Sequence, residues 1–98
     1  SSDVCSSDLG NDTLLGGSLA DWIFGGVGDD SLTGNEGADF LSGELGNDRL
    51  TGDSGDDTLN GDGGHDWVSG GDGEDAVYGQ SGNDTLSGGP ANDTIGGG

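Results

Sequence analysis

Aliphatic side chains recur every nine residues along most of the chain, each between two variable positions. From Gly16 onward the sequence divides into nine consecutive units of nine residues, preceded by a less regular unit at 7–15. Three residues of each unit, such as Thr58-Leu59-Asn60, alternate polar, apolar and polar, which predicts a short strand with one buried face. The other six are rich in Gly, Asn and Asp, which favours a tight turn because Gly adopts positive φ without steric cost.

One turn and one short strand make half a coil, so two units are expected to close one full coil. Alternate units would then stack as parallel strands about 4.8 Å apart. The core would be a single aliphatic layer between two sheets. One sheet is expected to bury Leu14, Leu32, Leu50, Val68 and Leu86, and the other Ile23, Leu41, Leu59, Val77 and Ile95.

Three further places of the unit hold nearly constant residues. Gly occupies the first place in nine of ten units and the fourth in eight, with Leu19 and Ala91 as the exceptions at the fourth place. The sixth place is Asp in every unit: Asp12, Asp21, Asp30, Asp39, Asp48, Asp57, Asp66, Asp75, Asp84 and Asp93.

The pattern G-G-x-G-x-D-x-U-x, with an aliphatic residue at U, resembles the RTX, or haemolysin-type, calcium-binding repeat. The resemblance covers residues 10–96, and ten copies in phase make it specific. It implies an all-β, right-handed parallel β-roll, a solenoid with two repeats per coil and calcium ions in the turns. Residues 1–9 differ in style from the repeats. We therefore expect a non-repeat lead-in over 1–9, non-native or disordered, and a calcium-binding β-roll over 10–98.

The composition indicates that this roll needs a further source of stability. Leu, Ile, Val and Phe make up 18 of the 98 residues and the formal net charge is −19, values typical of disordered chains. One aliphatic layer, at about 25 cal/mol per Å², cannot order about 90 residues against roughly 1–2 kcal/mol of backbone entropy each. The acidity also argues against nucleic-acid binding, and no apolar run approaches the roughly 20 residues of a membrane span.

In such a stack the aspartates lie in two rows, one along each edge. We call these the Asp48 row (Asp12, Asp30, Asp48, Asp66, Asp84) and the Asp57 row (Asp21, Asp39, Asp57, Asp75, Asp93). Carboxylates roughly 5 Å apart repel one another, and a hard cation between successive turns would reverse that effect. Ca²⁺ takes about six to eight oxygens and accepts backbone carbonyls, whereas Mg²⁺ demands stricter geometry and Zn²⁺ prefers N and S ligands.

The resemblance also implies a ligand set, with each ion between units two apart. One unit offers the carbonyls of its second and fourth places and its Asp, and the next offers those of its first and third places and its Asp. For a central pair these are Asn35, Gly37 and Asp39, facing Gly52, Ser54 and Asp57. Ten units allow at most about eight ions. Besides the ten aspartates, Asn35 and Ser54, the candidate ligands are Gly25, Gly28, Gly34, Gly37, Gly43, Gly46, Gly52, Gly55, Gly61, Gly64, Gly70, Gly73, Gly79 and Gly82.

Other kinds of site are less favoured by the sequence. Gly52-Asp53-Ser54-Gly55 imitates a serine-protease motif, yet it lies in phase with the repeat, and His65 is the single histidine that could act as a base. No H-E-x-x-H or G-x-S-x-G motif is present, so no enzyme activity is expected of these residues. His65 is predicted to be a solvated turn residue rather than a ligand. Ice-binding rolls carry flat Thr/Asn ladders, but the third and fifth places here are mixed.

Three aromatic residues, Trp22, Phe24 and Phe40, are expected on the outer side of the roll, with Trp22 and Phe40 in register one coil apart. Aromatic pairing across strands explains them. The alternative is a docking patch for an upstream domain of the same parent chain.

The resemblance implies a calcium-binding module of a secreted bacterial protein, exported by type I secretion and folded by Ca²⁺ outside the cell. The alternatives are the C-terminal repeat region of a secreted enzyme (metalloprotease, lipase or epimerase) and a segment of a large RTX adhesin or toxin. Calcium ions are the expected partners.

Overall fold

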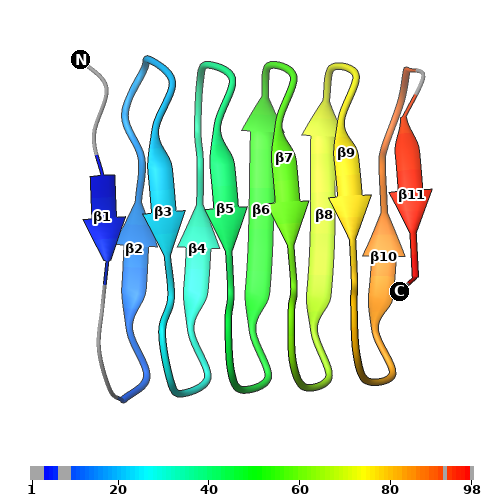
Figure 1. The fold of residues 1–98 in the computed structure, drawn as a ribbon. Helices are drawn as coiled ribbons and strands as arrows, with labels where there is room; N and C mark the ends of the chain where they lie inside the picture. The colour runs from blue at the N-terminus through cyan, green and yellow to red at the C-terminus, as the bar shows by residue number, and fades with distance from the viewer. Residues whose placement is uncertain (1–3, 7–9, 92, 98) are drawn as a thin grey trace.

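The computed structural model describes residues 4–6, 10–91 and 93–97, and in them short strands form two parallel sheets joined by turns (Figure 1). The strands are β1 (Val4–Ser6), β2 (Thr13–Leu15), β3 (Trp22–Phe24), β4 (Ser31–Thr33), β5 (Phe40–Ser42), β6 (Arg49–Ser54), β7 (Thr58–Asn60), β8 (Trp67–Asp72), β9 (Ala76–Tyr78), β10 (Thr85–Ser87) and β11 (Thr94–Gly96).

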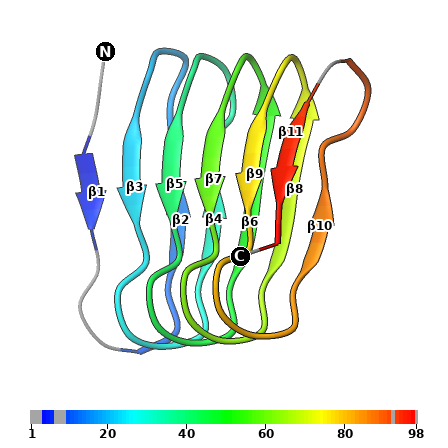
Figure 2. The ribbon, with the colours of Figure 1, turned by 45° about the vertical axis from the view of Figure 1, so that its right-hand side comes forward.

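Each coil of the roll contributes one strand to each of the two sheets. One sheet has the order β1-β3-β5-β7-β9-β11 and the other β10-β8-β6-β4-β2, so successive strands alternate between the sheets (Figure 2). Each strand pairs with the strand two further along, and aliphatic residues face their equivalents, as with Leu32 and Leu50 or Leu41 and Leu59. The predicted parallel β-roll with two repeats per coil is confirmed.

The first strand precedes the repeats. Val4–Ser6 pair in register with Trp22–Phe24 of β3, so this sheet extends into the segment that we assigned to the lead-in. Residues 1–3 and 7–9 lie outside the described residues. The division of the chain at residues 9 and 10 stays a prediction.

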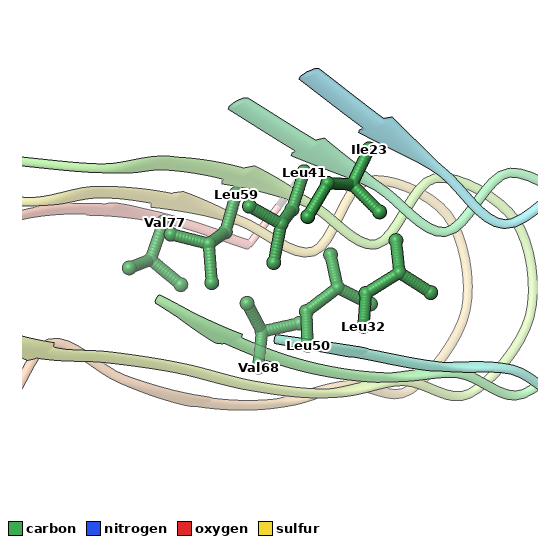
Figure 3. Packing of buried hydrophobic residues seen from close by; sticks show 7 residues of the cluster. All are labelled: Ile23, Leu32, Leu41, Leu50, Leu59, Val68 and Val77. Carbon is green, nitrogen blue, oxygen red and sulfur yellow. The ribbon is translucent and has the colours of Figure 1, made fainter. Parts of the chain in front are cut away.

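The core is the single aliphatic layer that the eighth places of the repeat predict (Figure 3). Leu14 and Leu86 are only partly buried and pack against it. Ile95 differs from the expectation, since 52% of it is exposed. The reason is its position in β11, the edge strand of its sheet, where only β9 lies beside it. Among the described residues, the buried aliphatic side chains of this layer are Ile23, Leu32, Leu41, Leu50, Leu59, Val68 and Val77.

The outer faces carry the aromatic residues. Trp22 is 58% exposed, and its ring centroid lies 5.9 Å from that of Phe40, which is 6.0 Å from Phe24. These tilted contacts are the predicted aromatic pairing across β3 and β5. Docking of an upstream domain on this patch stays a prediction. On the other sheet the Arg49 guanidinium lies 4.6 Å from the ring centroid of Trp67. The described residues contain no helix long and apolar enough to cross a membrane.

Candidate metal centre

The aspartates of the repeat lie in two rows at opposite edges of the roll, as predicted. The Asp48 row occupies the turns that lead into β2, β4, β6, β8 and β10. The Asp57 row occupies the turns on the opposite edge, at the other end of the strands (Figure 1). Most of these side chains are buried, which is unusual for a carboxylate. Those exposed by 3% or less are Asp21, Asp30, Asp39, Asp48, Asp57, Asp66 and Asp75.

From Asp30 onward, one oxygen of each buried carboxylate accepts a hydrogen bond from the backbone of the preceding coil. The N–H of Asp39 donates to Oδ1 of Asp57, and the N–H of Asp57 donates to Oδ1 of Asp75, both at 2.8 Å. The same pattern runs along the other row, where the N–H of Asp30 donates to Oδ1 of Asp48 at 2.8 Å. The rows are therefore held in register by the carboxylates themselves.

From Asp30 to Asp84, the second oxygen of these carboxylates has no hydrogen-bond partner. Leaving a buried acceptor unsatisfied costs about 1–3 kcal/mol, and more when the group is charged. A row of such atoms therefore calls for a cation that can bind several oxygens at once. Among the described residues, the buried Oδ2 atoms without a hydrogen bond belong to Asp30, Asp39, Asp48, Asp57, Asp66, Asp75 and Asp84.

Burial and crowding change the acidity of the rows. Burial raises the pKa of Asp48 and of Asp57 from 3.8 to about 7, and that of Asp66 to about 6. The backbone N–H groups that bind Oδ1 lower each of these pKa values, and the neighbouring carboxylates of the same row raise them. Without a cation, a large part of the rows' negative charge is thus unfavourable at neutral pH.

Acidification is expected to weaken calcium binding and to favour folding of the metal-free chain. Because the pKa values of Asp48 and Asp57 are raised from 3.8 to about 7, the folded chain takes up protons in this range that the unfolded chain does not. The stability of the metal-free roll therefore falls as pH rises from about 4 to about 7, while protons compete with calcium below about 7. Calcium titrations at about pH 8 and about pH 5, with circular dichroism of the metal-free chain across that range, measure both effects. Equal calcium affinity at the two pH values would contradict the prediction that calcium and protons compete for the same aspartates.

The first-place glycines leave room beside the unpaired oxygens. A Cβ on Gly25 would lie 2.8 Å from Oδ2 of Asp30 and 2.9 Å from the carbonyl oxygen of Gly43. A Cβ on Gly52 would likewise meet Oδ2 of Asp57, and it would lie 2.6 Å from the carbonyl oxygen of Gly70. A carboxylate oxygen and a carbonyl oxygen of the next coil thus converge beside each of these glycines. A side chain there would fill the space.

The fourth-place glycines allow the turns to stack closely. Gly55 has a φ of 109°, a left-handed conformation, and a Cβ on it would overlap the carbonyl oxygen of Gly37 one coil earlier. Gly46 and Gly64 have the same relation to the fourth-place glycines before them. Both the backbone conformation and the close approach therefore require glycine here.

Substitution of Gly55 by Ala is expected to destabilise the calcium-loaded roll by about 2–3 kcal/mol, since it adds backbone strain and steric overlap. Thermal unfolding in saturating calcium measures this loss. Gly63→Ala is the matched control. The nearest atom to its Cβ would be the flexible end of Leu45, at 3.2 Å, and its φ is not positive. Equal destabilisation by the two variants would show that close stacking is not what selects glycine.

Two carboxylates and several carbonyls per site are an all-oxygen donor set, which suits Ca²⁺. Within the described residues no group of three His, Cys, Asp or Glu side chains gathers at one point, so the backbone would have to supply the remaining ligands. A family model described as the RTX calcium-binding nonapeptide repeat (4 copies) matches residues 15–50, 42–77, 51–86 and 69–98. The chain belongs to this RTX repeat family. Searches of curated proteins and of solved structures gave no match.

The RTX ligand pair predicted for the centre of the roll is brought together by the fold. The N–H of Ser54 donates to the carbonyl oxygen of Asn35 at 3.1 Å, which places these two turns directly against each other. Gly55 lies against Gly37 in the same pair of turns, and Asp39 and Asp57 share the hydrogen bond described above. The assignment of these atoms as calcium ligands stays a prediction. Asp12, Asp84 and Asp93, toward the two ends of the rows, are less buried than the central aspartates.

The protease-like motif does not form a catalytic site with His65. Ser54 lies in β6, at the edge of the Asp57 row, whereas His65 lies in a turn of the Asp48 row on the opposite edge. The RTX roll is a structural calcium-binding module.

The hydrogen bonds between fifth-place residues on the edge of the Asp48 row were not predicted. His65 is exposed, as predicted for a solvated residue, but its Nδ1 accepts a hydrogen bond from the N–H of Asn83 at 2.9 Å. Its own N–H donates to Oδ1 of Asn47 at 2.8 Å. The fifth place is mixed when all units are compared. On the edge of the Asp48 row, however, every fifth-place side chain carries an acceptor atom. This pattern is visible in the sequence when every second unit is compared.

Proposed function

We propose that this chain is a calcium-binding module whose turns hold Ca²⁺ ions between units two apart, up to about eight ions in all. The observation that carries the proposal is the row of buried Oδ2 atoms without hydrogen-bond partners on both edges. Eight divalent ions would reduce the formal charge of −19 to about −3. The ions would thus compensate the charge that the folded roll brings together.

The residues of the turns contribute in different ways. The ten aspartates would supply Oδ2, while Oδ1 of those from Asp30 to Asp93 stays on the backbone of the preceding coil and fixes the direction of the carboxylate. First-place glycines keep the adjacent space open. The second-place carbonyl of Asn35 lies at the contact between coils, where it accepts a hydrogen bond from the N–H of Ser54. Bound Ca²⁺ supplies positive charge and links successive coils.

Secretion is the finer part of the proposal. In a cytosol with little free calcium, repulsion within the Asp rows would keep the chain unfolded, and calcium-rich medium outside the cell would allow it to fold. Type I secretion by a bacterium suits such a chain. Membership of a secreted enzyme, or of an adhesin or toxin, stays a prediction about the parent protein.

Isothermal titration with calcium, with magnesium at the same concentrations as the comparison, tests the binding function. We expect calcium to bind at several sites per chain with affinity in the range of extracellular modules, about 10⁻⁴–10⁻³ M or tighter, and magnesium to bind far more weakly. Equal binding of the two metals would indicate a diffuse ion atmosphere and would overturn the proposal.

A further inference from the structure

The two edges of the roll differ in the residue that directly precedes each aspartate. On the edge of the Asp48 row this fifth place always carries a side chain with an acceptor at the Oδ1 or Nδ1 position. On the edge of the Asp57 row, Ala20 and Ala38 have no side-chain acceptor at all. The acceptor-bearing residues of the first edge are Asn11, Asp29, Asn47, His65 and Asn83.

These side chains form a second ladder outside the carboxylates. Asp29 donates its N–H to Oδ1 of Asn11, Asn47 donates to Asp29, and His65 donates to Asn47, each at 2.8 Å. The bond from Asn83 to His65 Nδ1 continues the ladder. The fifth-place residues of the ladder are exposed, so they lie outside the buried row.

The other edge cannot build the same ladder. The N–H of Glu74 donates to Oδ1 of Asp56 at 2.8 Å, but the methyl group of Ala38 offers nothing to the N–H of Asp56. Both edges pair residues 18 apart, so the difference between them follows from the fifth-place residue types alone.

The two ladders run in opposite directions through each turn of the Asp48 row. At Asp48, the preceding N–H of Asn47 is bound to the earlier coil through Asp29, and its own N–H is bound to the later coil through Asp66. Both peptide groups before the carboxylate are thus fixed. A side chain that is already fixed before a cation binds loses less conformational entropy on binding.

We propose that the fifth-place side chains are positioning residues, which make the Asp48 row hold cations more tightly and release them more slowly than the Asp57 row. This inference rests on the proposed function. A hydrogen bond of this kind corresponds to about a two- to tenfold change in affinity or release rate.

Terbium release from each row can be followed separately. Tb³⁺ takes the oxygen ligands of Ca²⁺ and emits when a nearby tryptophan is excited. Trp67 directly follows Asp66, so Trp22→Phe leaves a reporter of the Asp48 row. Trp22→Phe/Trp67→Phe/Thr58→Trp places the only tryptophan directly after Asp57, at a similar depth in the stack. Excess chelator starts the release.

We expect the Asp48 row to release terbium about two to ten times more slowly than the Asp57 row. Asn47→Ala should accelerate release at the Asp48 row alone. Ala38→Asn, which gives the N–H of Asp56 an acceptor, should slow release at the Asp57 row alone.

Each contrary result has a distinct meaning. Equal release from the two rows, or a change at both rows in either variant, would overturn the positioning role, because general destabilisation affects both rows. Absence of terbium emission in both reporters would overturn the proposed function itself.

Discussion

Removal of calcium is expected to abolish the β-sheet signal of this chain. Burial raises the pKa of Asp48 and of Asp57 to about 7, so above pH 7 these two carboxylates lose their protons and add to the repulsion within the rows. The aliphatic layer of seven fully buried side chains is too small to offset that repulsion together with the loss of chain entropy. Circular dichroism in excess chelator should therefore show an expanded chain, and millimolar calcium should restore the β signal cooperatively.

Salt provides the control for this experiment. Sodium chloride at the same ionic strength screens the carboxylates but cannot link successive coils, so it should restore little of the signal. A β-rich spectrum in excess chelator above pH 7 would show that the roll is stable without the metal.

Asp57→Ala is expected to lower the stability of the calcium-loaded roll by about 3–5 kcal/mol, the range for removing one partner of a buried ionic contact. Asp57 is 2% exposed, and it lies between Asp39 and Asp75, so its loss affects the sites on both sides. Thermal unfolding in saturating calcium measures the change.

Asp56→Ala is the matched control, because it removes the same charge from the neighbouring position. Asp56 is exposed, and its Oδ1 accepts one hydrogen bond from the N–H of Glu74. We expect a loss of about 1 kcal/mol or less. Similar losses in the two variants would mean that net charge, rather than position in the row, determines stability.

The fold could be predicted because the repeat leaves few alternatives. An aliphatic residue every nine positions, with no insertion, fixes both which strands pair and which face is buried, as the register of Leu41 with Leu59 shows. Ile95 was the exception, since its exposure depends on its position in an edge strand and not on its place in the repeat.

The site was predicted in part. An invariant Asp in every unit indicated the two rows. The hydrogen bond from the preceding coil to Oδ1 depends on side-chain geometry, which the aligned repeat sequences do not show. The second place is left-handed even at Glu44 and Gln80, with φ of 69° and 66°. Sequence favours Gly, Asn or Asp for that conformation, so these two residues gave no signal of it.

The outer ladder of fifth-place side chains was missed because the residue types at this place differ from unit to unit. Asn47, His65 and Asp29 differ in charge and shape, yet each presents an acceptor at the same distance from its backbone. Because the roll alternates its units between two edges, the rule is visible only when every second unit is compared.

The number of calcium ions bound by the Asp57→Ala and Asp56→Ala variants tests the central claim most directly. Isothermal titration at about 0.15 M salt limits the contribution of general electrostatic attraction. Ordered sites between the coils predict that Asp57→Ala binds fewer ions than the unmodified chain, whereas Asp56→Ala binds the same number with slightly lower affinity. If both variants lose the same amount of calcium, the ions are held diffusely by the net charge, and the ordered calcium rows do not exist.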